Sequence, residues 1–126
     1  MLALILARMN LRDFFEPQAI NLNLAATTKE DVIAEMVALL RVDERAAQTL
    51  ARLIQRREQL GSTGIGRGVA VPHCRSLAVS RLRVGLGLSP QGIAWEAVDQ
   101  RPVHAVFLIV APPNEVSNQY LPVLGK

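Results

Sequence analysis

The run VHAVFLIVA, residues 103–111, constrains the fold more than any other part of the chain. Apolar residues fill it with one polar interruption, His104, and this pattern is typical of a strand at the centre of a sheet. We interpret His104 as a strand-end residue rather than as a second functional site. The chain is therefore expected to fold around a sheet that has this run as a central strand.

Shorter runs predict further strands of the same sheet. GVAVP at residues 68–72 has the composition of a short buried strand. LRVGLGLS at residues 82–89 places an apolar side chain at every second position, which is the period of a strand. We expect residues 90–102, between this strand and the central one, to form a loop or a hairpin.

The N-terminal third predicts a strand followed by a helix. We expect a short helical turn over residues 11–15, ended by Pro17, and then a half-buried strand with alternating apolar residues at 20–24. Thr27 and Glu30 have the spacing of a capping box. The segment EDVIAEMVALL that follows has its apolar residues on one helical face, so we expect an amphipathic helix there.

Asp43 is suited to cap a second helix that runs to about Glu58. Acidic residues lie at its positive end and arginines, including Arg57, at its negative end, as the helix dipole favours. Helices come before strands, without a repeat or a low-complexity linker. We therefore expect an α/β fold with a single domain, in which a mixed central β-sheet is flanked by helices.

Composition argues against several classes of function. The 126 residues suffice for one domain, and the net charge of +3 comes from 14 basic and 11 acidic side chains that are mixed along the chain. Without basic blocks or an aromatic stacking platform, we expect no nucleic-acid binding.

One cysteine fits a reducing, cytoplasmic location. MLALILAR is too short to cross a bilayer, so we expect no membrane insertion, a start at Met9 and an extension over residues 1–8.

The stretch REQLGSTGIGRGVAVPHCRS, residues 57–76, has the glycine content of a phosphate-binding loop. Its glycines follow a predicted helix and lead into a predicted strand, which is the reverse of the order in a dinucleotide-binding fold. A nucleotide-hydrolysing loop would need lysine and serine or threonine where Arg67 and Gly68 stand. We therefore expect no nucleotide cofactor. Glycines that only permit tight turns, and a structural histidine, remain an alternative reading of this stretch.

His73 in the same stretch is a candidate nucleophile. Pro72 restricts the backbone before it, so the histidine leaves a strand end in a constrained direction. A neutral imidazole can attack phosphorus through one ring nitrogen while the other is held by a hydrogen bond. Arg57, Ser62 and Thr63 are suited to surround the transferred group with positive charge and hydroxyls. The sequence thus predicts a phosphoryl-carrier site if the fold brings these residues together.

The stretch resembles the signature of the fructose/mannitol-type enzyme IIA domain of the bacterial phosphotransferase system, which includes the nitrogen-regulatory enzyme IIA. MNLRDFFEPQAINLNLAATTKEDVIAEMVALL resembles the opening strand and helix of that family, and GIAWEAVDQRPVHAVFLIVAPP its later hairpin and core strand. The similarity covers residues 9–126, which we assign to one enzyme IIA-like domain. It implies helices around a mixed sheet.

The resemblance also implies roles for individual residues. His73 matches the histidine that is phosphorylated by a phosphohistidine on a small carrier protein, HPr or its nitrogen-branch counterpart, without a metal or another cofactor. Arg57 matches an arginine beside it, and Glu58, Ser62 and Thr63 match positions that line the pocket. For Glu58 a helix-end pairing with an arginine stays equally open, and for Ser62 and Thr63 a turn-capping role does.

Several positions depart from the family pattern. Tyr120 stands where members often carry a second histidine, and a tyrosine can donate a hydrogen bond to phosphate but offers no imidazolium charge. Cys74 replaces a small residue, usually glycine, and we interpret it as a buried apolar side chain rather than a redox group or metal ligand. Arg67 replaces a frequent asparagine, and we expect it to face water. The family domain continues with helices, so a short protein and a C-terminally truncated one are both open.

These observations lead to one hypothesis and one rival. The hypothesis is a phosphotransferase that carries phosphoryl groups in a phosphoenolpyruvate-dependent system, in a sugar-transport or a nitrogen-regulatory branch. It would accept the group from an HPr-like carrier on His73, and its further partner would be an enzyme IIB, a transporter or a sensor kinase. The rival is a non-catalytic docking module of the same fold that binds a transporter or a sensor kinase.

Overall fold

The computed structural model describes residues 15–113, which form two helices and six strands. In chain order these are β1 (Phe15–Asn21), α2 (Lys29–Leu39), α3 (Glu44–Leu60), β2 (Gly64–Gly66), β3 (Val69–Ala70), β4 (His73–Arg75), β5 (Arg83–Ile93) and β6 (Val103–Ala111). Within this part of the chain no helix has the length and apolar composition needed to cross a bilayer. The predicted extension over residues 1–8 and Tyr120 lie outside the described residues.

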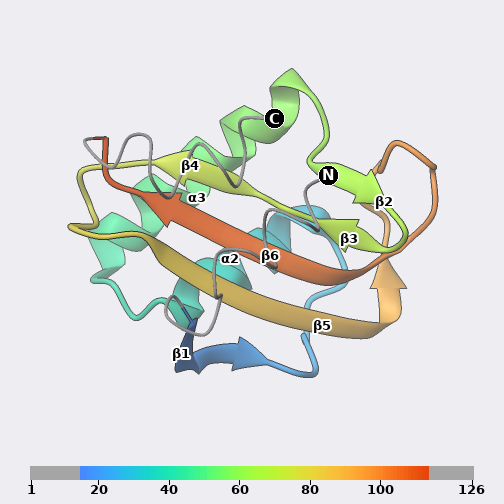
Figure 1. Cartoon of the computed structure of the whole chain (residues 1–126), viewed down its shortest axis with the longest axis horizontal. Coiled ribbons are helices and arrows are strands. Elements are labelled where there is room, and N and C mark those ends of the chain that lie inside the picture. Colours follow the sequence, from blue (N-terminus) through green and yellow to red (C-terminus); the bar gives the residue numbers. More distant parts are fainter. Residues whose placement is uncertain (1–14, 114–126) are drawn as a thin grey trace.

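β6 is a central strand, as its apolar run predicts (Figure 1). β5 pairs with one edge of it antiparallel, and β3 and β4 pair with the other edge in parallel. β1 extends the sheet beyond β5 in parallel, and β2 closes the opposite edge antiparallel to β3. The sheet is therefore mixed, which confirms the predicted α/β fold class.

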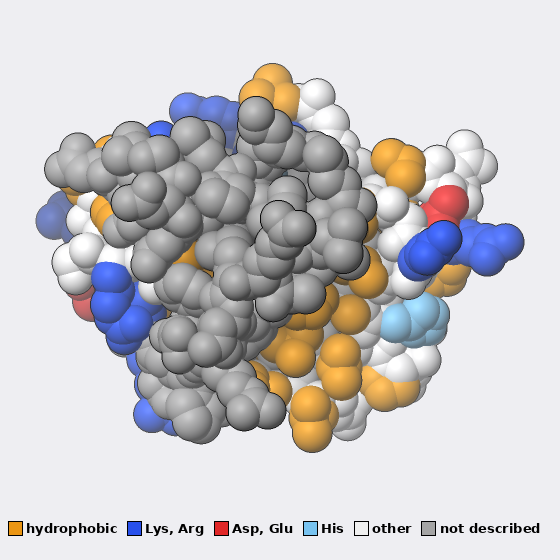
Figure 2. Space-filling model, in the orientation of Figure 1, with side chains coloured by type: hydrophobic (Ala, Val, Ile, Leu, Met, Phe, Trp, Pro, Cys, Tyr) orange, Lys and Arg blue, Asp and Glu red, His pale blue; other side chains and the backbone are white. Residues whose placement is uncertain are grey.

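Both helices cover the same face of the sheet (Figure 1). The core between the helices and the sheet is apolar and includes Ile33, Met36, Leu50, Ile54, Val106, Leu108 and Val110. α2 approaches β5 closely because Gly85 and Gly87 lie beneath it: a Cβ on Gly87 would collide with Sδ of Met36. The alternating leucines of β5 therefore turn to the other face, where they are half-buried. Figure 2 views that face and shows apolar side chains on it.

The N-terminal third differs from the prediction at four points. Phe15 belongs to β1 and not to a helical turn, and residues 11–14 lie outside the described range. Pro17 lies within β1, which is an edge strand. Such a strand tolerates proline because one of its sides has no partner strand, so the missing N–H costs no hydrogen bond. β1 also ends at Asn21, so the predicted strand over 20–24 is displaced toward the N-terminus. The cap of α2 is Thr28 and not Thr27, since the Thr28 hydroxyl accepts the N–H of Asp31 at 3.2 Å.

The remaining elements agree with the prediction more closely. Asp43 caps α3, which ends at Leu60, two residues beyond the expected end. β5 continues through residue 93 and pairs with β6. The segment over 90–102 therefore forms a hairpin, which is one of the two structures that the sequence predicted for it. The short strands β2 and β4 were not predicted, because three residues carry little periodicity and two of those in β2 are glycine.

Candidate functional site

His73 is the first residue of β4, and the central strand holds its backbone. β3 and β4 keep one register along β6, with Val69 opposite Ala105 and His73 opposite Ile109. They are thus two segments of one extended strand that is interrupted at Pro72. Pro72 has no N–H to donate, but its carbonyl oxygen still accepts the N–H of Ile109 at 3.0 Å. The histidine is therefore presented from a fixed backbone position.

The imidazole of His73 is oriented by its own strand. Nδ1 lies 2.9 Å from the carbonyl oxygen of Val71, which can only accept, so Nδ1 donates its hydrogen and the lone pair of the neutral ring is on Nε2. Burial lowers the pKa of His73. The bond to Val71 raises that pKa, the charge of Arg57 lowers it and the charge of Glu58 raises it, and the net effect is a lowered value. A lowered pKa favours the neutral ring at pH 7.

Cys74 points away from the histidine. Its side chain packs in the core between the helices and the sheet, so strand alternation turns His73 to the opposite face. Burial raises the pKa of the Cys74 thiol to about 12, so it is not a thiolate at neutral pH. The interpretation of Cys74 as a small buried apolar residue is confirmed, and the two neighbours cannot share a metal ion.

Two side chains at the end of α3 fix the loop that follows it. Arg57 donates from Nη1 to the carbonyl oxygen of Gly61 at 2.8 Å. Glu58, which is 8% exposed, accepts the backbone N–H of Thr63 at 3.2 Å and the Thr63 hydroxyl as well. Thr63 is itself buried. The loop between α3 and β2 is therefore held by the helix that precedes it.

Ser62 ties this loop to a distant segment. Its hydroxyl donates to the carbonyl oxygen of Trp95 at 3.3 Å and accepts the N–H of Gly64 at 3.0 Å. The structure thus brings Arg57, Glu58, Ser62 and Thr63 together in one short loop. It gives the two hydroxyls partners within the protein, so a phosphoryl group would reach them only by exchange of these bonds. A guanidinium that gives one N–H to Gly61 has further donors.

The glycines of the stretch allow a turn and a close approach. Gly66, Arg67 and Gly68 have φ values of 99°, 57° and 79°, so residues 67 and 68 form a tight turn between β2 and β3. A Cβ on Gly64 would lie only 2.7 Å from Cβ of Ala97. The stretch follows a helix and enters a strand, as the sequence predicts. Gly66 and Gly68 thus serve the hairpin turn, as the turn alternative expected for them, whereas Gly64 allows the close approach of Ala97.

The sequence did not single out two residues of this network, Lys29 and Trp95. Lys29 Nζ lies 2.8 Å from Oε2 of Glu58 and 3.2 Å from the carbonyl oxygen of Trp95. Lys29 is the first residue of α2, where the helix dipole disfavours a cation. That unfavourable position is a signal that could have pointed to a specific acidic partner. The sequence carries no comparable signal for Trp95, which the fold buries completely.

His104 and Arg67, which the sequence singled out, make their contacts outside this network. His104 is the second residue of β6, and its Nδ1 donates to the carbonyl oxygen of Ser89 at 2.9 Å, which agrees with a strand-end role. Arg67 is exposed, as predicted. Its backbone N–H is bound by the carboxylate of Asp99 at 3.0 Å.

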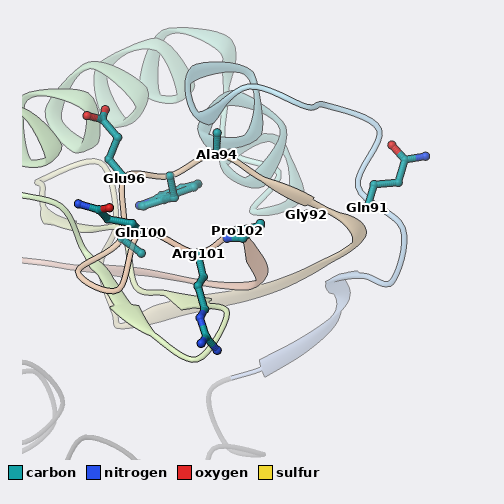
Figure 3. Close-up of a pocket in the computed structure, with 9 residues that line it drawn as sticks. Gln91, Gly92, Ala94, Glu96, Gln100, Arg101 and Pro102 are labelled. Carbon is teal, nitrogen blue, oxygen red and sulfur yellow. The ribbon is translucent and has the colours of Figure 1, made fainter.

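A surface pocket lies beside the loop before β6, and none of the residues predicted for the phosphoryl site lines it. Its lining consists of Gln91, Gly92, Ala94, Trp95, Glu96, Ala97, Gln100, Arg101 and Pro102. Figure 3 shows that the side chains of Gln91, Glu96 and Arg101 point in different directions. A ligand site needs polar groups that converge, so we assign no ligand to this pocket.

Comparison with known proteins agrees with the fold. The sequence profile described as "Phosphoenolpyruvate-dependent sugar phosphotransferase system, EIIA 2" matches residues 13–126. The chain belongs to this family. The resemblance seen in the glycine-rich stretch is thereby confirmed, and EIIA domains are phosphotransfer components in general.

Relatives of this EIIA chain occur in both branches of the system. The PTS system fructose-specific EIIABC component of Bacillus subtilis is 34% identical over 122 residues, which cover 94% of this chain and 19% of the relative. The nitrogen regulatory protein of Bradyrhizobium diazoefficiens is 32% identical over 108 residues, which cover 82% and 69%. The chain thus spans about a fifth of the first relative's length and about two thirds of the second's.

A solved structure supports the EIIA fold directly. The crystal structure of nitrogen regulatory protein IIA-Ntr from Neisseria meningitidis matches 79% of this chain and 69% of its own, with a TM-score of 0.70 and 28% identity. The fold expected from the sequence resemblance is confirmed.

Proposed function

We propose that this chain is a cytoplasmic phosphoryl carrier that accepts a phosphoryl group on Nε2 of His73 from the phosphohistidine of an HPr-like protein. The observation that carries the proposal is the bond from Nδ1 of His73 to the carbonyl oxygen of Val71. It fixes the tautomer in which Nε2 holds the lone pair, and the lowered pKa of His73 keeps that lone pair unprotonated at pH 7.

The transfer itself needs no general base. The Nε2 lone pair of His73 forms a bond to phosphorus while the N–P bond on the carrier breaks, and the electron pair of that bond stays on the carrier's imidazole. The Nδ1 hydrogen of His73 remains on Nδ1, bound to Val71. The new positive character of the ring is stabilised by that bond, and in-line transfer then depends on position and on charge around the phosphoryl oxygens.

Arg57 is the cation that we assign to those oxygens. Its charge acts on His73, and its guanidinium is already placed by the bond to Gly61. Ser62 and Thr63 support the loop and have their hydroxyls bonded inside the protein, so we assign them a secondary role that requires those bonds to exchange. A tyrosine at position 120 would add a neutral donor.

The acceptor after His73 follows from the relatives. The Bacillus subtilis relative carries EIIA within an EIIABC chain, which favours an enzyme IIB unit as the acceptor in a sugar branch. The nitrogen regulatory relatives favour a regulatory role in which the phosphoryl state of His73 is read by a transporter or a sensor kinase. Both roles use the same first step on His73.

The test is phosphorylation in a reconstituted chain of carriers. The protein is incubated with labelled phosphoenolpyruvate, enzyme I and each of several HPr-like carriers, and acid-labile phosphate on the protein is measured. We expect label on the wild-type protein and on His104→Ala, which removes the other histidine, and none on His73→Ala. Label that survives in His73→Ala would show that the wrong residue has been assigned.

The docking module remains the second candidate, because the hydroxyls of Ser62 and Thr63 already have partners and position 120 is not histidine. A docking module predicts that none of the carriers phosphorylates the wild-type protein. Such a result, obtained with carriers that phosphorylate an authentic enzyme IIA in parallel, would replace the carrier function with the docking function.

A further inference from the structure

Lys29 is held by groups from two other parts of the chain. Its Nζ lies 2.8 Å from Oε2 of Glu58 at the end of α3, and it donates to the carbonyl oxygen of Trp95 at 3.2 Å. The same ammonium lies 5.3 Å from the centre of the Trp95 indole ring, within the range of a cation–π interaction. A flexible lysine is thus confined to one position between α2, α3 and the loop before β6.

The ion pair that Lys29 makes is buried. The Lys29 side chain is 13% exposed and the Glu58 side chain 3%. A buried carboxylate is costly unless it is paired and hydrogen-bonded, and removal of one partner leaves the other charge uncompensated. Lys29 supplies the compensating charge, and Thr63 supplies the neutral donors from its N–H and its hydroxyl.

A continuous series of bonds leads from this ion pair to the candidate nucleophile. Glu58 accepts from Thr63, and the carbonyl oxygen of Thr63 accepts the N–H of Val71 at 3.0 Å. The carbonyl oxygen of Val71 then accepts from Nδ1 of His73 at 2.9 Å. β6 holds the backbone of His73, and Val71, whose carbonyl group orients the imidazole, is bonded to the loop that Glu58 holds.

The charge of Glu58 also bears on the reaction. Glu58 acts electrostatically on His73, and a phosphoryl group that arrives there brings further negative charge. We propose that Lys29 is a positioning residue of the phosphoryl site, whose ammonium offsets the charge of Glu58 and, through Glu58, fixes Thr63 and the loop beside His73. This proposal rests on the phosphoryl-carrier function proposed above.

The test uses the full chain and three variants. Lys29→Met leaves the Glu58 charge uncompensated, and Lys29→Met/Glu58→Gln removes both charges together. Arg52→Met is the matched control, because it removes one positive charge from the exposed face of α3. Two quantities are measured on each protein: the titration of His73 by NMR of the imidazole C–H signals, and the initial rate of phosphoryl transfer from the carrier.

We expect Lys29→Met to raise the pKa of His73, because the negative charge of Glu58 then acts without its partner. We expect the transfer rate to fall by roughly tenfold to a hundredfold, the size of effect that follows from misplacing a reacting group. The double variant lacks the charge of Glu58, so we expect its His73 titration to fall back to the wild-type midpoint or below it, and most of the rate to be recovered. Arg52→Met should match the wild type in both.

Three results would overturn the proposal: a folded Lys29→Met protein with the wild-type His73 titration, a double variant that recovers neither quantity, or an Arg52→Met protein that behaves like Lys29→Met. If Lys29→Met does not fold, the double variant decides, since it must fold and His73 in it must titrate at or below the wild-type midpoint. If no carrier labels the wild-type protein, the phosphoryl-carrier function fails, while the NMR titration still decides the role of Lys29.

Discussion

The protonation of His73 is set by its surroundings at the residue scale. Burial is the largest influence on its pKa and lowers it, the bond to Val71 and the charge of Glu58 oppose that effect, and the charge of Arg57 adds to it. A nucleophile that stays neutral at mildly acidic pH keeps its lone pair where an exposed histidine would lose it.

This lowered pKa predicts both activity and stability at acidic pH. We expect the NMR titration midpoint of His73, and the acidic limb of the phosphoryl-transfer rate, to lie below 6.5, the usual value for histidine. Between the lowered pKa and pH 6.5, the unfolded chain binds a proton at His73 that the folded protein does not. The stability that neutral His73 contributes is therefore fully present above pH 6.5. It decreases as the pH falls from 6.5 to the lowered pKa.

Urea unfolding of the wild type and of His73→Gln across this pH range checks the stability part. The difference in free energy of unfolding between the two proteins should change only between pH 6.5 and the titration midpoint of His73, since His104 is common to both. A midpoint at or above 6.5 would contradict the account of His73 as a buried neutral nucleophile.

At the scale of elements, the hairpin between β2 and β3 carries a strained residue. Arg67 has a φ of 57°, which costs most residues about 1–2 kcal/mol, and Gly68 follows with positive φ as well. Asparagine tolerates this conformation, and asparagine followed by glycine is the preferred pair in such a two-residue turn. The strain belongs to the backbone and not to the charge of the side chain.

We therefore expect Arg67→Asn to raise the free energy of unfolding by about 0.5–1 kcal/mol, measured by urea denaturation. Arg67→Ala is the control, since it removes the same charge but keeps a residue that disfavours positive φ. It should leave stability within about 0.5 kcal/mol of the wild type. Equal stabilisation by both substitutions would show that charge, and not the turn, is responsible.

At the scale of the whole molecule, stability depends on the core between the two helices and the sheet. Leu108 lies on the helix-facing side of β6 and is fully buried, whereas Val98 in the preceding loop is 74% exposed. Leu108→Ala is expected to cost about 2–5 kcal/mol, through lost burial and the cavity it leaves. This is a large fraction of the roughly 5–15 kcal/mol that stabilises a typical domain.

The same urea experiment tests that expectation. Val98→Ala, a slightly smaller apolar truncation at an exposed position, should change the free energy of unfolding by less than about 0.5 kcal/mol. If the two truncations had similar costs, the helix-facing side of β6 would not be the core of the molecule.

Much of the fold was predictable because it depends on local patterns. The apolar run at 103–111, the alternation at 82–89 and the Asp43 cap each specify an element without reference to the rest of the chain. The predictions were wrong where a tertiary neighbour decides. Pro17 is compatible with a strand only at a sheet edge, and β2 is a strand only because β3 pairs with it.

The glycine-rich stretch was recognisable from the sequence, because a short run of residues with fixed spacing carries the family signature. The tertiary structure decided which ring nitrogen of His73 holds the lone pair, through the Val71 carbonyl. It also decided that Glu58 pairs with Lys29, 29 residues earlier in the chain. A hydrogen bond or an ion pair between distant residues leaves no periodic trace in a sequence, so only folding reveals it.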